Sequence, residues 1–487
     1  MYDEDHGDAF GSETLLLQKV VAKLAAVGEM SKKKEADPFL EGLGEQENAV
    51  LHAFQGGDST ELREWDDQDS HAASESSDDD LDDDDHEEGS YAHAKSMIDR
   101  MGLSLDMINS WNVCTLELDR TRNHAAAMFL MNPHNHGAHI DSDTMAQFLE
   151  ACEANYNKTL PYHTWFHAVD VMHCVHRLMN ILKASNFLSS NERFALLVSS
   201  AAHDLCHPGL NNTYLVEASN EIALMYNDKS PLENMHCAKL FEITNPHGSG
   251  MGGIAKHGDL ASPRNDTKDT AIFQDLSKTD FHEVRSICID AILHTDNALH
   301  FPMIKEVQML YEVNSEIFQD AEEAGRLDKS VEWPTKDVTE VFRKTETRKL
   351  LTKLILHYAD ISNSLKPFRI CRTWAFQAME EFCRQGDMER RYGIPVQPLN
   401  DRQKVNKSFS QICFIEFLVT PMVMSTLAIF PPTEALGEQM IQNVKAWHRQ
   451  WLNDTSPKPS EEQERALTMR VVKLESRFNN RRHSGLF

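Results

Sequence analysis

Apolar residues recur at helical spacing along most of the chain after about residue 95. The segments with this pattern are 141–155, 166–184, 191–205, 212–226, 231–244, 278–294, 347–363, 370–385, 407–429 and 434–452. Few stretches alternate between apolar and polar residues with the period of two that is typical of strands. The pattern predicts an all-α domain of roughly 14 or more helices over residues 95–454, followed by a tail at 455–487.

Two polar segments interrupt this pattern. Residues 245–270 are rich in Gly and Asp, and residues 321–338 are rich in charged side chains. Neither has apolar positions at a helical or strand period, so both are expected to be flexible insertions in the domain.

The N-terminal residues 1–94 differ from the rest of the chain. Residues 1–100 contain 28 Asp and Glu against 8 Lys and Arg, which accounts for -20 of the formal net charge of -28. The run of like charges at 78–85 repels itself, so residues 56–90 are expected to be disordered. The acidic balance argues against a nucleic-acid partner, which would need a basic surface.

Residues 14–27 stand out within this region as a short amphipathic helix, and three lysines follow at 32–34. Its apolar face can pack on protein or, through 14–34, on a membrane surface. The nine Cys lack zinc-site spacing, which is typical of reduced thiols in a cytoplasmic protein. We expect neither a signal peptide nor a span of the ~20 apolar residues that a bilayer requires.

Metal-ligand side chains are concentrated in three of the apolar segments. His203 and Asp204 are adjacent after a long apolar run, His163 and His167 are one helical turn apart, and Asp360 lies in another apolar segment. His and Asp together are suited to a two-metal hydrolytic centre. His167, His203, Asp204 and Asp360 can hold the first ion, with Asp204 bridging to the second. His163 would lie beside the metals, where an imidazole can donate a proton.

Several motifs in the same order resemble the class I 3′,5′-cyclic nucleotide phosphodiesterases. They are Tyr162-His163 with Phe166-His167, His203-Asp204 with His207-Pro208-Gly209, the segment 221–228, Ala359-Asp360-Ile361-Ser362-Asn363, Glu380-Glu381-Phe382, and Gln411 with Cys413-Phe414. The resemblance covers roughly residues 95–452 of this chain and implies an HD-type catalytic domain.

The resemblance implies an enzyme that hydrolyses cAMP or cGMP to the nucleoside 5′-monophosphate and so ends cyclic nucleotide signalling. It implies Zn²⁺ at the first site, held by His167, His203, Asp204 and Asp360, and Mg²⁺ or Mn²⁺ at the second. His207, Glu221 and Thr295 match positions around the second ion. A bridging hydroxide would attack phosphorus, and His163 would protonate the departing 3′ oxygen.

The resemblance also implies a purine pocket. Gln411 and Phe414 lie at i, i+3, so one helix face can present an amide to the base edge and a ring to its face. Asn363 matches a position in the base pocket and Tyr162 one that lines the metal pocket. Ala378 stands where the family usually has a branched aliphatic side chain opposite the ring. The preference between cAMP and cGMP stays open, because the Gln411 amide can rotate to match either purine.

Two other function classes are alternatives. Another HD-type metallohydrolase acting on nucleotides would explain His203-Asp204 but not Gln411 with Phe414. A non-enzymatic cyclic-nucleotide-binding or scaffold protein would be expected to lack a metal ligand or His163, and all are present. A homodimer is a further partner to test.

Overall fold

The computed structural model describes residues 95–245 and 270–484. Helices joined by turns and loops make up this part of the chain, and it contains no strand. The helices are α4 Leu105–Ile108, α5 Arg120–Leu130, α6 Ser142–Ala154, α7 Trp165–Leu182, α8 Ser190–Ala202, α9 Asn212–Glu217, α10 Glu221–Met225, α11 Pro231–Ile243, α12 Lys278–Leu293, α13 His300–Val313, α14 Ser315–Leu327, α15 Lys336–Phe342, α16 Thr345–Asp360, α17 Phe368–Tyr392, α18 Lys407–Phe414, α19 Thr420–Ile429, α20 Glu434–Asp454 and α21 Glu461–Ser484. This confirms the all-α prediction. The predicted helix at 14–27, the disorder at 56–90 and most of the insertion at 245–270 lie outside the described residues.

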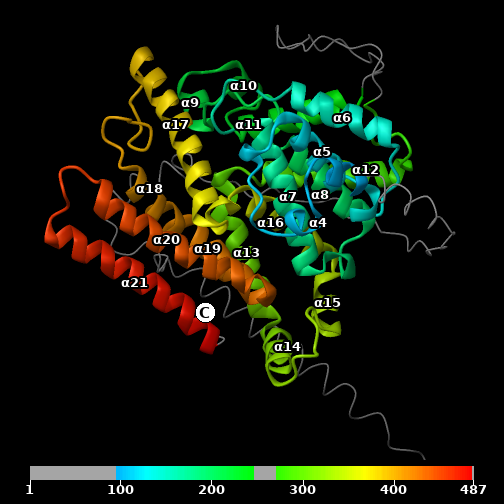
Figure 1. The fold of residues 1–487 in the computed structure, drawn as a ribbon. Coiled ribbons are helices and arrows are strands. Elements are labelled where there is room, and N and C mark those ends of the chain that lie inside the picture. The colour runs from blue at the N-terminus through cyan, green and yellow to red at the C-terminus, as the bar shows by residue number, and fades with distance from the viewer. Residues whose placement is uncertain (1–94, 246–269, 485–487) are drawn as a thin grey trace, which may run out of the picture.

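The centre of the domain consists of α7, α8, α12 and α16, which pack against one another (Figure 1). α7 is buried on most sides along its length, and α8 is buried without interruption from Phe194 to Ala202. A helix that is apolar all round is stable only inside a protein. These buried helices form the rigid part of the fold.

The ends of the central helices carry the predicted metal ligands. A capping box begins α8, in which the Ser189 hydroxyl accepts from the Glu192 N–H and the Glu192 carboxylate accepts from the Ser189 N–H. The helix ends at His203, its C-cap residue. α16 ends at Asp360, and His167 lies in the first turn of α7.

The C-terminal helices form a second group beside this centre. Figure 1 shows α21 running alongside α20, and the two helices are in contact. Leu467, Val471, Leu474 and Phe478 on α21 are buried. The tail predicted at 455–487 thus contains a helix that packs on the domain, because spacings of four, three and four residues give this segment an apolar face that completes the core.

Three further expectations change. The predicted insertion at 321–338 is helical up to Leu327, because Phe318 and Ala321 anchor α14 in the core, so the loop is confined to 328–335. The predicted helix over 212–226 is two helices, since Ser219 in the turn between them has a φ of 49°. The helix α13 was not among the predicted segments.

One continuous helical stretch, Lys407–Ile429, is long and apolar enough to cross a membrane, with a mean hydropathy of 2.0. This corrects the expectation that no such stretch exists. However, 72% of its apolar window is buried inside the domain, as in the core helix of a soluble protein. All nine cysteines are free thiols, as predicted.

Candidate active site

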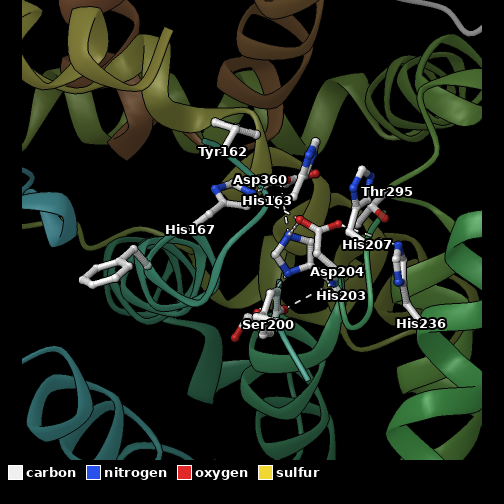
Figure 2. A network of polar contacts seen from close by, with 12 residues as sticks. Tyr162, His163, His167, Ser200, His203, Asp204, His207, His236, Thr295 and Asp360 are labelled. Atoms are coloured by element: carbon white, nitrogen blue, oxygen red, sulfur yellow. Dashed lines mark hydrogen bonds and ion pairs between the residues drawn. The ribbon is translucent and has the colours of Figure 1, made fainter. Parts of the chain in front are cut away.

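The four predicted ligands of the first metal converge at one point. His167 Nε2 lies 3.0 Å from Asp360 Oδ1, and His203 Nε2 lies 3.2 Å from Asp204 Oδ2. Across the cluster, His203 Nε2 is 3.4 Å from Asp360 Oδ1 and His167 Nε2 is 3.6 Å from Asp204 Oδ2. Figure 2 shows the four side chains pointing toward one another. Residues 193 positions apart in the sequence are thus brought into contact.

The chemistry of these atoms fits a divalent metal. His203 Nε2 and Asp204 Oδ2 are both buried, and neither has a hydrogen-bond partner of suitable geometry among the described residues. His203 Nδ1 lies 3.0 Å from the Ser200 carbonyl oxygen, to which its N–H donates, so the Nε2 lone pair is available as a ligand. Buried polar atoms without partners are rare unless something else satisfies them.

The charge of the cluster also favours a cation. Burial raises the pKa of Asp360, but the hydrogen bond from His167 and charge interactions with His203 and His167 bring it below its ordinary value. Burial lowers the pKa of His203, yet the Asp204 and Asp360 carboxylates reverse this and hold it well above its ordinary value. Two buried carboxylates thus draw positive charge to the space between them.

A second group of polar side chains lies on the far side of Asp204. Figure 2 shows His207, Thr295 and His236 there. His236 Nδ1 donates to the Leu205 carbonyl at 2.6 Å, which directs its Nε2 to within 3.9 Å of Asp204 Oδ1. Asp204 therefore lies between two groups of polar side chains.

The prediction for Glu221 is wrong. Glu221 is exposed in the first turn of α10 and does not line the cavity. Glu233 of α11 does line it, is 8% exposed, and accepts a hydrogen bond of 2.9 Å from Asn212. Burial and the neighbouring Asp296 carboxylate raise the pKa of Glu233, as expected for two acids that lie close together away from water.

His163 pairs with Glu381 of α17. Its Nδ1 donates to Glu381 Oε1, while the backbone N–H groups of Tyr162 and His163 donate to Oε2 at 3.0 and 3.2 Å. The His163 ring stacks on His207, with centroids 3.8 Å apart. Three hydrogen bonds to one carboxylate fix the His163 ring and leave its Nε2 free to face the cavity.

The electrostatics of this pair keep a proton on His163. Burial lowers the His163 pKa, but the carboxylates of Glu381, Asp204 and Asp360 outweigh it and raise the pKa to about 9. Burial raises the pKa of Glu381, but His163 lowers it to about 2. Burial and the His163 charge hold the His207 pKa well below its ordinary value. The neighbouring carboxylates thus favour the protonated form of His163, and burial favours the neutral form of His207.

Asp204 and Asp360 of the cluster line a cavity of about 210 Å³ that extends to the predicted base-binding residues. Tyr162, Asn363, Gln411 and Phe414 all line it, and Asn363 Nδ2 donates to the Tyr162 hydroxyl at 3.3 Å. Ala375 and Ala378, two small side chains, also form part of its wall. The sequence thus identified residues at both ends of one cavity.

Three residues of the site were not predicted as such: Glu233, His236 and Glu381. Glu233 and His236 have a local signal, because a Glu and a His at i, i+3 share one helix face. Glu381 lies in the motif Glu380-Glu381-Phe382, but its role was not predicted because its partner His163 is 218 positions away.

Fold and site together define a helical hydrolase-like domain with a His and Asp centre for divalent metals. The family model for 3′5′-cyclic nucleotide phosphodiesterases matches residues 162–440, which is more than half of the chain. The chain belongs to this family.

Curated relatives have similar sequences over part of their length. A human high affinity cAMP-specific and IBMX-insensitive 3′,5′-cyclic phosphodiesterase 8A is 29% identical over 310 residues, covering 63% of this chain and 34% of the relative. A human dual specificity calcium/calmodulin-dependent 3′,5′-cyclic nucleotide phosphodiesterase 1C is 31% identical over 283 residues, covering 58% and 33%. The chain thus spans about a third of the length of these relatives.

Solved structures share the fold. The phosphodiesterase domain of Salpingoeca rosetta rhodopsin phosphodiesterase has a TM-score of 0.57 at 24% identity, covering 72% of this chain and 94% of that domain. The structure of LmjPDEB1 in complex with IBMX has a TM-score of 0.57 at 25% identity, covering 74% and 98%.

Proposed function

We propose that this protein hydrolyses 3′,5′-cyclic nucleotides to nucleoside 5′-monophosphates. One observation carries the proposal. Asp204, whose buried Oδ2 has no hydrogen-bond partner among the described residues, lines the same cavity as Gln411 and Phe414, so a metal-bound phosphate and a purine can be held at once. The family and its cAMP-specific and dual-specificity relatives support this substrate class.

The metal ligands would be divided into two sets. His167, His203, Asp204 and Asp360 suit Zn²⁺, which accepts imidazole and carboxylate ligands. Asp204 would bridge to Mg²⁺ or Mn²⁺, whose waters His207, Glu233 and Thr295 would hold. When bound, two such metal ions would neutralise charge on the phosphate and lower the pKa of a bound water molecule.

His163 supplies the proton that the reaction requires. Its Nδ1–H is held by Glu381, so its Nε2–H is directed to the substrate side of the cavity. A raised pKa keeps the ring protonated near neutral pH, as donation to a leaving oxygen requires.

The base end of the cavity accepts a purine through Phe414 and the Gln411 amide. No side chain among the described residues forms a hydrogen bond that fixes the rotation of this amide. We therefore propose that both cAMP and cGMP are substrates, as in the dual-specificity relative.

The test is hydrolysis of cAMP and cGMP in parallel by the purified chain with Mg²⁺. Activity should be lost on strong chelation and return with Zn²⁺ and Mg²⁺. His163→Ala should lower kcat about 10²- to 10⁴-fold and retain zinc. Zinc-loaded protein that hydrolyses neither nucleotide would shift the assignment to another phosphohydrolase or, if it binds cyclic nucleotide, to a non-catalytic binding protein.

A cytoplasmic location, a homodimer and membrane contact through residues 14–34 are further proposals. Light scattering at several concentrations tests the dimer. Flotation with anionic vesicles, comparing the chain with and without residues 14–34, tests membrane contact.

A further inference from the structure

The C-terminal helix α21 contacts the helix that presents the base-binding residues. Arg470 of α21 forms an ion pair with Glu416, with Nη2 2.7 Å and Nε 3.0 Å from Oε2. Arg470 Nη2 also lies 3.6 Å from Cys413 Sγ. The two contacted residues bracket Phe414 in sequence.

Arg470 contacts both α18 and the helical turn that follows it. At 3.6 residues per turn, Phe409 and Cys413 lie on one face of α18, Gln411 lies on roughly the opposite face, and Phe414 lies between the two. The Arg470 guanidinium is 5.7 Å from the Phe409 ring centroid and 5.4 Å from that of Phe417. The charge and the planar face of the guanidinium thus contact α18, the helix that carries Gln411 and Phe414.

The backbone at this contact is unusual. Residues Ile415–Val419 form a π-helix directly after α18, and Glu416 lies within it. A π-helix is less stable than an α-helix and persists where the surroundings hold it. The Glu416 side chain is 20% exposed and that of Arg470 23%, so removing one partner leaves a half-buried charge without its counterion.

The position of Arg470 depends on how α21 packs on α20. Gly437 of α20 lets the Phe478 ring approach closely, because a Cβ at Gly437 would lie 2.3 Å from Phe478 Cε2. Lys445 of α20 and Glu475 of α21 form an ion pair at the same interface. The second pair does not involve α18 and so provides a matched control.

We propose that Arg470 is a positioning residue for base binding, and that α21 holds Gln411 and Phe414 in place through Glu416. This proposal rests on the proposed function. The metal ligands come from the ends of α7, α8 and α16, whereas the Arg470 guanidinium contacts Cys413 and Glu416, so base affinity and chemistry should separate.

The test compares Arg470→Met with Glu475→Gln in the full chain. Arg470→Met should raise KM for the cyclic nucleotide at least about 10-fold, since small misplacements of binding groups have large effects. Its kcat should stay within about twofold, and zinc content should be unchanged. Amide hydrogen exchange in 407–419 should be faster in Arg470→Met and unchanged in Glu475→Gln. The charge swap Arg470→Glu with Glu416→Arg should recover part of the KM.

A second variant, Gly437→Val, displaces Phe478 and should reproduce the KM increase without altering Arg470. An unchanged KM in Arg470→Met, an equal increase in Glu475→Gln, or loss of zinc with kcat would each overturn the proposal. If the wild-type chain hydrolyses neither nucleotide, the proposed function fails, and hydrogen exchange then decides separately whether Arg470 holds α18.

Discussion

The two ends of the cavity are built differently. At the metal end, the ligands come from the ends of helices that are buried in the centre of the fold, and each imidazole has a defined partner. At the base end, the wall includes Ala375 and Ala378, and the helix that carries Gln411 continues into a π-helix held by α21. The comparison indicates that chemistry relies on a rigid centre, while affinity for the base can be adjusted from outside it.

The largest effect is expected at the metal end. Asp360→Asn removes a carboxylate ligand, and kcat/KM should fall by more than about 100-fold, since even outer partners of metal ligands are worth roughly 10–100-fold. Zinc content, measured by elemental analysis, should fall in parallel. Gln411→Ala is the comparison variant and should retain zinc while KM rises. Loss of zinc in both variants would mean that the two ends are not independent.

Glu233 and Glu221 form the next pair. Glu233→Gln removes a buried carboxylate from the cavity, and we expect activity at limiting Mg²⁺ to fall about 10- to 100-fold. Glu221→Gln makes the same substitution at an exposed carboxylate, and its activity should match that of the wild type. A titration of activity against Mg²⁺ measures both. A larger loss in Glu221→Gln would restore the assignment made from the sequence.

The pH dependence tests the pairing of His163 with Glu381. A proton donor works only while protonated, so activity should fall as the pH rises through the His163 pKa. Because Glu381 helps to raise that pKa to about 9, Glu381→Gln should move the alkaline limb of the kcat profile to lower pH. At pH 8.5 the loss should be about 10-fold greater than at pH 6.5. An equal loss at every pH would indicate a purely structural role for Glu381.

The smallest effect is expected at Ala378, in the wall of the cavity. Ala378→Ile adds three carbons opposite Phe414, and each buried methylene is worth about 0.8 kcal/mol. Repacking offsets part of this gain, so KM should fall roughly 3- to 10-fold with kcat little changed. KM for cAMP and cGMP measures the effect. An increase in KM would show that the base already fills the space beside Ala378.

Much of the fold and site was predictable because the signals are local. Helical periodicity identified most of the core helices, although α13 and the packing of α21 were missed. Glu233 was missed because two similar acidic residues lie 12 positions apart in the sequence, and only their burial distinguishes them.

The sequence by itself determined the chemical character of the protein: an all-helical domain, a set of His and Asp ligands, a proton donor beside them, and an amide with an aromatic ring at i, i+3. Periodicity and residue type express these properties over a few neighbouring positions. Only the tertiary structure decided which distant groups meet: Asp360 with His167, Glu381 with His163, and Arg470 with Glu416. It also decided that Glu233, and not Glu221, lines the cavity. These choices depend on how buried helices pack, and packing joins residues whose separation in sequence carries no information about their distance in space.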